Sequence, residues 1–179
     1  GAVDDAIRHS ITKMSHLHLT ATEQCRQRVI QLGERPESVF NVGAPGLENI
    51  ARLDLLSKSE VEERIGKELG ERSLLVAWHP PTLSKGEEEQ QLRVLLEALR
   101  SSKANLIFSS ANADAGGRSI NLAIEEFVSR NSKRASYHES FGRNLYLSIL
   151  HHVSGIIGNS SSGIIEAPSI PLPAINIGD

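Results

Sequence analysis

The stretch GIIGNSSSGIIEAP, residues 155–168, decides the fold of this chain. It opens with a short apolar run at 155–157, continues through three consecutive serines, and becomes apolar again before Pro168. A brief apolar run without alternation is typical of a strand that is buried on both faces of a parallel sheet. The proline then ends the short helix that follows the serines. The stretch therefore predicts a strand, a loop rich in hydroxyl groups, and a helix.

Short apolar runs alternate with longer amphipathic runs along the rest of the chain. We expect strands at 16–20, 39–42, 74–78, 106–109, 135–138, 155–157 and 174–177. The spacing of apolar residues predicts helices at 4–15, 21–32, 87–100, 119–130 and 144–151. This rhythm indicates an α/β fold with a doubly wound, Rossmann-like parallel sheet that is covered by helices.

A turn-rich break, GAPG at residues 43–46, divides the chain. The two strands expected before it cannot readily bury both of their own faces. We therefore interpret residues 1–43 as the remnant of an amino-terminal Rossmann-like domain. Residues 44–179 contain the other five strands, and we interpret them as a carboxy-terminal Rossmann-like domain.

Composition excludes several classes of function. The 179 residues are 39 % hydrophobic and 23 % charged, as in ordinary globular proteins. A net charge of -3 and an aromatic content of 4 % argue against a nucleic-acid partner. No apolar run approaches the ~20 residues of a membrane span. The single cysteine, Cys25, excludes an internal disulfide, suits a cytoplasmic protein, and is expected to be packed against apolar neighbours.

The serine loop after the strand at 155–157 is the first candidate site. Ligands of open parallel sheets bind beyond the carboxyl ends of the strands. Ser160, Ser161 and Gly163 have small side chains at the start of a helix, where a phosphate can approach backbone N–H groups. Glu166 follows and could accept hydrogen bonds from ribose hydroxyls. The alternative is an ordinary capped helix after a loop.

Four further residues carry groups suited to chemistry. His79 follows the strand at 74–78 and precedes two prolines, so the imidazole could serve as a general acid or as a donor to a diphosphate. Asn112 follows the strand at 106–109 and could donate to a ligand. Asp4 and Arg8 share one face of a helix at a spacing of four. The alternatives are a half-exposed loop histidine, a turn, and a solvated ion pair.

The sequence gives no reason to expect a metal or a cofactor. His16 and His18 point to one side of a strand, but no third ligand accompanies them. The phosphate-loop, dinucleotide-binding, zinc-protease and nucleophile-elbow motifs are all absent from the sequence.

Taken together, these residues resemble the hydrolysing UDP-N-acetylglucosamine 2-epimerases, especially the branch of the sialic acid pathway. The resemblance rests on DDAIRHSITKMSHLHL, RVIQLGERPESVFNVGAPGLENI, WHPPT, NADAGG, FGRNLYLSIL and GNSSSGIIEAPSIPLPAINIGD. It implies the carboxy-terminal half of a GT-B-like two-domain enzyme that holds a UDP-sugar between its domains. It also implies a homodimer.

The resemblance assigns roles to individual residues. It implies that His79 and Asp4 are catalytic and that no metal takes part. It implies that Arg8, Asn112, Ser160, Ser161, Gly163 and Glu166 bind the substrate. The opening strands of such an enzyme, with further acidic and basic groups, are not in this sequence, so catalysis is expected to need them.

The implied reaction converts UDP-N-acetylglucosamine and water into N-acetylmannosamine and UDP. Anti elimination of UDP gives a glycal, and water then adds at C1. One alternative is the corresponding reaction on UDP-N,N'-diacetylbacillosamine. A second is a UDP-binding fragment without catalysis, and a third is a glycosyltransferase, which would need an acceptor.

Overall fold

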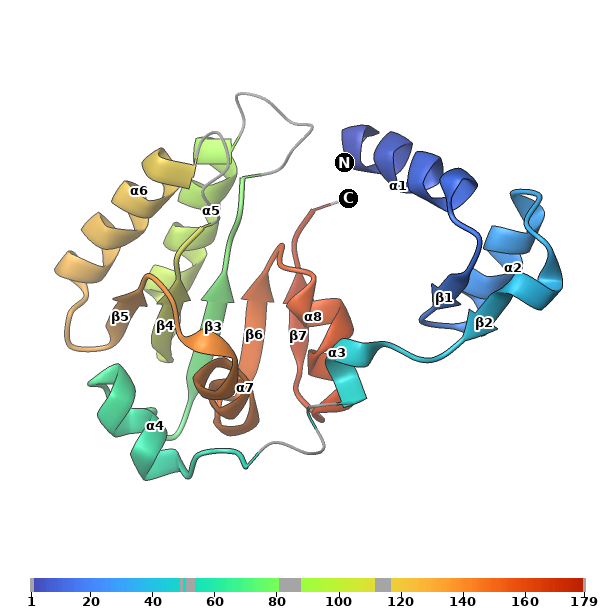
Figure 1. The fold of residues 1–179 in the computed structure, drawn as a ribbon. Helices are drawn as coiled ribbons and strands as arrows, with labels where there is room; N and C mark the ends of the chain where they lie inside the picture. The colour runs from blue at the N-terminus through green and yellow to red at the C-terminus, as the bar shows by residue number, and fades with distance from the viewer. Residues whose placement is uncertain (1, 49, 51–53, 81–87, 112–116, 179) are drawn as a thin grey trace. The chain divides into compact units, whose positions relative to one another are not determined.

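The structure is a computed structural model that describes residues 2–48, 50, 54–80, 88–111 and 117–178. The chain forms two compact units, residues 1–52 and residues 53–179 (Figure 1). The division lies later in the chain than the break that we expected at residues 43–46.

The first unit contains a two-stranded parallel sheet with helices. Strand β1 pairs with β2, and His18 lies opposite Val39 in the register. Helix α2 begins after Thr22, whose hydroxyl accepts a hydrogen bond from the Cys25 N–H. The elements are α1 (Ala2–Met14), β1 (His18–Thr20), α2 (Glu23–Gln31), η1 (Pro36–Ser38), β2 (Val39–Asn41) and α3 (Pro45–Glu48).

Much of the apolar surface of the first unit is exposed. Ile7, Ile11 and Met14, the apolar stripe of α1, are 51 %, 58 % and 79 % exposed. Helix α2 buries none of its residues, and Cys25 is exposed. The prediction of a packed thiol was therefore wrong, because the stripe that carries Cys25 contacts too little of the small sheet to be covered.

The second unit is a five-stranded parallel sheet in the order β5-β4-β3-β6-β7. This confirms the Rossmann-like sheet and the five strands expected from the sequence in this part of the chain. Its helices are α4 (Lys58–Ile65), α5 (Glu88–Ser101), α6 (Gly117–Arg130), α7 (Gly142–His152), α8 (Ser162–Ile165) and η3 (Ala167–Ser169). Its strands are β3 (Ser73–Ala77), β4 (Asn105–Ser109), β5 (Ala135–His138), β6 (Gly155–Gly158) and β7 (Ala174–Asn176).

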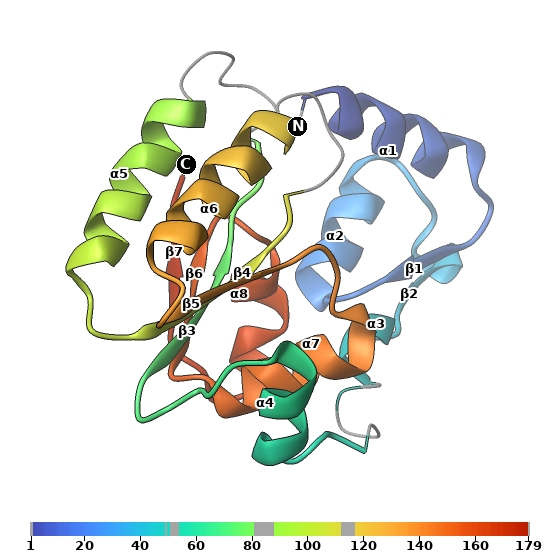
Figure 2. The same ribbon diagram turned by 90° about the vertical axis from the view of Figure 1, so that its left-hand side faces the viewer.

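Helices cover both faces of this sheet. The connections from β3 to β5 run in one direction along the sheet, and the connection from β5 to β6 runs back in the other direction. Right-handed crossovers therefore place α5 and α6 on one face and α7 on the opposite face, as Figure 2 shows. On the first face, Leu92, Phe127 and Trp78 belong to a buried apolar cluster. Each such side chain contributes about 1.5–3 kcal/mol by its burial.

The sheet reverses its direction of winding between β3 and β6. These two strands are neighbours, and the chain leaves them toward opposite sides of the sheet. Such a switch point is the usual ligand site of an open parallel sheet. Gly158 ends β6 at a φ of +146°, and a Cβ there would overlap the carbonyl oxygen of Ala77. Only glycine fits where these two strands approach each other.

Candidate functional site

A cavity of about 410 Å³ lies at the carboxyl ends of the strands in the second unit. We call it the switch-point cavity. Its walls come from the segments after β3, β4, β5 and β6 and from the first turns of α7. The position is the one that the sheet topology predicts for a ligand.

The cavity brings together four of the residues that the sequence singled out. His79, Ser160, Ser161 and Glu166 all line it. Their segments are far apart in the chain and are joined here because β3 and β6 are adjacent. The shared cavity is what a diphosphate site with a nearby imidazole requires.

Another residue that the sequence singled out has a different position. Gly163 is not among the lining residues, and a Cβ on it would overlap the Asn176 side chain. Its N–H donates to the Ser160 carbonyl at 3.2 Å. The missing side chain thus makes room for β7. Asn112 lies outside the described residues.

Asp4 and Arg8 lie on α1 of the first unit. The Arg8 guanidinium pairs with the Asp5 carboxylate, three residues away. Arg8 is 72 % exposed in its side chain. The solvated ion pair at the helix start, which the sequence offered as the alternative, is therefore present, and Asp5 is its acid.

The serine loop has polar atoms without partners. Ser162 is 6 % exposed, and its Oγ has no hydrogen-bond partner among the described residues. The same holds for Glu166 Oε2, which is also buried. Helix α8 is a single turn, so Glu166 follows it directly instead of lying two turns inside a helix. Each such buried atom costs about 1–3 kcal/mol when left unpaired, which favours a polar ligand.

Tyr146 is a cavity residue that the sequence analysis missed. Burial raises the pKa of its phenol, the hydroxyls of Ser162 and Ser160 lower that pKa, and the Glu166 carboxylate raises it. The phenol therefore stays protonated at neutral pH and can donate a hydrogen bond. The sequence pattern placed Tyr146 on the apolar stripe of its helix, and only the fold shows that it reaches the serine loop.

An arginine and a phenylalanine belong to the part of the cavity wall that follows β5. Arg143 and Phe141 line the cavity. The His138 ring lies 4.9 Å from the Phe141 ring, and burial lowers the pKa of His138. A guanidinium is always charged and matches phosphate oxygens in geometry, so Arg143 supplies a cation for an anionic ligand.

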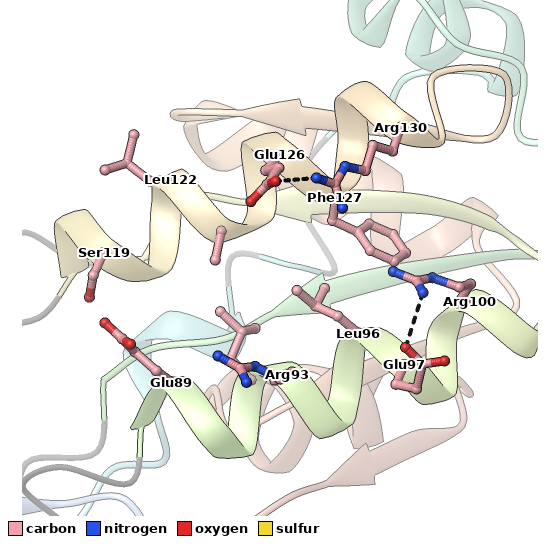
Figure 3. A pocket seen from close by; sticks show the side chains of 12 residues that line it. Glu89, Arg93, Leu96, Glu97, Arg100, Ser119, Leu122, Glu126, Phe127 and Arg130 are labelled. Carbon is pink, nitrogen blue, oxygen red and sulfur yellow. Dashed lines mark hydrogen bonds and ion pairs between the residues drawn. The ribbon is translucent and has the colours of Figure 1, made fainter.

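A groove of about 400 Å³ lies between α5 and α6 (Figure 3). Two ion pairs lie along its helices, Arg100 to Glu97 at 3.2 Å and Arg130 to Glu126 at 2.5 Å. Among the described residues, none of the buried polar atoms without a partner lies in this groove. We therefore take the switch-point cavity as the candidate site.

The described part of the chain offers no group of three metal-ligating side chains. In that part there is also no helix that is both long and apolar enough to cross a membrane.

The comparisons with known proteins concern the whole sequence. All of it, residues 1–179, matches the UDP-N-acetylglucosamine 2-epimerase family. The chain belongs to this family.

Two curated relatives of this epimerase-family chain are similar over nearly all of its length. The polysialic acid biosynthesis protein P7 of Escherichia coli is 46 % identical over 98 % of this chain and 45 % of its own length. The GDP/UDP-N,N'-diacetylbacillosamine 2-epimerase (hydrolyzing) of Campylobacter jejuni is 41 % identical over 100 % of this chain and 47 % of its own length. The chain thus spans about half the length of the curated relatives it matches.

A solved structure shares the fold. The UDP-GlcNAc 2-epimerase of Neisseria meningitidis, bound to UDP-GlcNAc, has a TM-score of 0.75 at 15 % identity. The similarity covers 94 % of this chain and 46 % of that one. It confirms the Rossmann-like, GT-B-like architecture of the chain.

Proposed function

We propose that the full-length protein is a hydrolysing UDP-N-acetylglucosamine 2-epimerase, which releases N-acetylmannosamine and UDP. The observation that carries the proposal is the switch-point cavity, in which His79 and the serine loop share one space. Two buried polar atoms there, on Ser162 and Glu166, have no partner in the described part of the chain. Family membership supports the same reaction class.

The cavity provides groups for each part of a nucleoside diphosphate. Ser160 and Ser161 offer hydroxyl donors to the diphosphate, and Arg143 offers positive charge. Glu166 Oε2 is a vacant acceptor for the ribose hydroxyls. We also propose that Arg8, Asn112 and Gly163 contact the substrate, as the resemblance to the epimerase family implies.

The chemistry depends on the departure of UDP. The C2–H of the sugar has no carbonyl beside it in the ring, so direct removal of this proton is unfavourable. When the C1–O bond breaks, positive charge at C1 acidifies the C2–H, and anti elimination gives a glycal. Water then adds at C1, and a proton returns to the opposite face of C2. Stabilisation of the leaving diphosphate is the main catalytic task.

His79 and Asp4 have separate roles in this proposal. The imidazole of His79 protonates or stabilises the leaving phosphate. Asp4 transfers protons at the sugar, together with acids of the remainder of the protein. All other groups bind and orient the substrate.

Replacing His79 tests its role. His79→Ala in the full-length protein should lower kcat by about 10²–10⁴-fold, as loss of a general acid does, with much less effect on UDP affinity. Steady-state kinetics and calorimetry with UDP measure the two effects. The control is His151→Ala, since His151 is exposed on α7 and is not a lining residue. Unchanged turnover in His79→Ala would remove the imidazole from the mechanism.

The decisive experiment for the function uses the full-length protein and UDP-N-acetylglucosamine. Free UDP should appear together with N-acetylmannosamine, without any acceptor. A requirement for an acceptor would indicate a glycosyltransferase. UDP binding without turnover would indicate a binding protein, and for this chain by itself we expect binding without turnover.

UDP-N,N'-diacetylbacillosamine is the second candidate substrate. The relatives named for this sugar, from C. jejuni and Legionella pneumophila, are 41 % and 34 % identical to this chain. Product analysis with both sugars at equal concentration separates the two, because the better substrate has the higher kcat/KM.

The same comparisons support a proposal for the biological setting. The relative from E. coli that is named for polysialic acid biosynthesis supports a place in sialic acid biosynthesis. We expect a cytoplasmic homodimer that needs no cofactor, nucleic acid or membrane.

A further inference from the structure

The ladder of backbone hydrogen bonds between β3 and β6 ends where Ala77 lines the switch-point cavity. The last pair in register is Ala77 and Gly158. One further backbone bond, from Asn159 N–H to the Ala77 carbonyl at 3.2 Å, extends this ladder. Beyond it the chain after β6 turns into the serine loop, so the backbone of His79 has no strand beside it on this side.

The side chain of Asn159 takes the place of the missing strand. Its Oδ1 accepts a hydrogen bond from the His79 N–H at 2.7 Å, and its Nδ2 donates to the His79 carbonyl at 2.7 Å. One side-chain amide thus holds both backbone groups of one residue. The two partners also settle the orientation of the amide, since an N–H can only donate and a carbonyl can only accept.

This pair of hydrogen bonds fixes the backbone from which the imidazole projects. Fixing N–H and C=O of one residue restricts both of its backbone dihedral angles, and these set the direction of its Cα–Cβ bond. The next residue is Pro80, which has no N–H, so His79 is the last position before it that can be held at both groups. Both bonds are short for N–H to O contacts.

We propose that Asn159 is the positioning residue of His79, and that it keeps the imidazole aimed at the diphosphate held by the serine loop. This inference rests on the proposed function. Asn159 is bonded covalently to Ser160, so a single residue joins the anion-binding loop to the backbone that carries the catalytic group. Asn159 itself is not among the cavity-lining residues.

A double-mutant cycle in the full-length protein tests the proposal. Asn159→Ala should lower kcat about 10- to 100-fold, which is the usual effect of misplacing a catalytic group, and should change KM and UDP affinity much less. In a His79→Ala background the same substitution should lower kcat by less than about twofold, because its only route to the chemistry is gone. An equal loss in both backgrounds overturns the proposal.

A conservative variant and a matched control complete the test. Asn159→Asp keeps the acceptor for the His79 N–H but loses the donor to the carbonyl, so its kcat should lie between those of Asn159→Ala and wild type. Asn105→Ala is the matched control. Like Asn159→Ala it removes two hydrogen bonds between a side-chain amide and the backbone, here to the carbonyls of Glu68 and Leu69 at the opposite end of the sheet. It should lower the melting temperature with kcat unchanged.

The outcomes separate this inference from the function on which it rests. A wild-type protein that neither binds UDP nor releases it overturns the proposed function and this inference together. An active wild type in which Asn159→Asp and Asn159→Ala retain full kcat overturns the inference alone. If Asn159→Ala does not fold, Asn159→Asp in the two His79 backgrounds gives the same comparison.

Discussion

Glu166 has one carboxylate oxygen, Oε2, that is buried in the switch-point cavity without a partner in the described chain. Nearby, burial raises the pKa of the Tyr146 phenol, which therefore stays protonated at neutral pH. These groups give the cavity acceptors and donors in close proximity. A ligand that supplies hydroxyl hydrogens, such as a ribose, would satisfy the vacant oxygen of Glu166.

Glu166→Gln tests the assignment of this carboxylate to the ribose. The charged acceptor is lost, and a hydrogen bond to a charged group contributes about 1.5–3 kcal/mol, so UDP affinity should fall about 10- to 150-fold. Calorimetry with UDP measures the loss. With 2',3'-dideoxy-UDP, which lacks the ribose hydroxyls, wild type and Glu166→Gln should bind equally. An affinity loss of the same size for both ligands would show that Glu166 contacts another part of the nucleotide.

His138 should make stability depend on pH. Burial lowers its pKa below the ordinary value of 6.5. In the unfolded chain the imidazole therefore binds a proton at a higher pH than in the folded chain, so stability falls as pH drops below about 6.5. Urea unfolding between pH 8 and pH 5 should show a shallower decline for His138→Gln than for wild type. Parallel curves for the two proteins would contradict this role.

At the scale of elements, helices with a clear apolar stripe were predicted well. The leucine stripe of α5 and the strands β3, β4 and β6 carry strong local patterns, and the structure confirms them. Helix α4 was missed because only Val61 and Ile65 are buried in an otherwise charged stretch. A capping box formed by Ser57 and Glu60 marks its start and could have revealed it.

The site was only partly predictable for a related reason. His79, Ser160 and Glu166 follow strands, so a general rule for parallel sheets finds them. Tyr146 and Arg143 lie on α7, and their place in the cavity depends on how that helix packs. Cys25 was misjudged because a helical stripe indicates a buried face only if something covers it.

Gly158 should be the least replaceable residue of β6. Gly158→Ala places a Cβ against the Ala77 carbonyl at a φ of +146°, so both sterics and backbone strain oppose it. The free energy of unfolding should fall by about 3 kcal/mol or more. Chemical denaturation measures this. Gly66→Ala is the matched control, because Gly66 also has a positive φ, of 60°, but open space around its Cβ position. Similar losses in the two variants would mean that strain, not close strand approach, governs Gly158.

At the scale of the whole molecule, the two units should differ in their ability to fold independently. Residues 53–179 contain a five-stranded sheet with helices on both faces, whereas residues 1–52 contain two strands and expose most of the apolar stripe of α1. Two strands bury too little surface for independent stability.

A fragment of residues 53–179 should therefore unfold in one cooperative transition and still bind UDP. Circular dichroism in urea and calorimetry measure the two properties. In the intact chain, the amides of β3 should exchange with solvent much more slowly than those of β1. Equal protection of β1 and β3 would show that the first unit is as stable as the second.

Trp78 follows β3 directly, is 1 % exposed, and is the one tryptophan of the sequence. The indole can be excited at wavelengths at which tyrosine does not absorb. Its emission therefore reports on the second unit and not on the first. Since this fluorophore is the chain neighbour of His79, the protein contains its own optical probe one residue away from a cavity-lining residue. Nucleotide titrations can be followed by that intrinsic fluorescence, without attaching a dye.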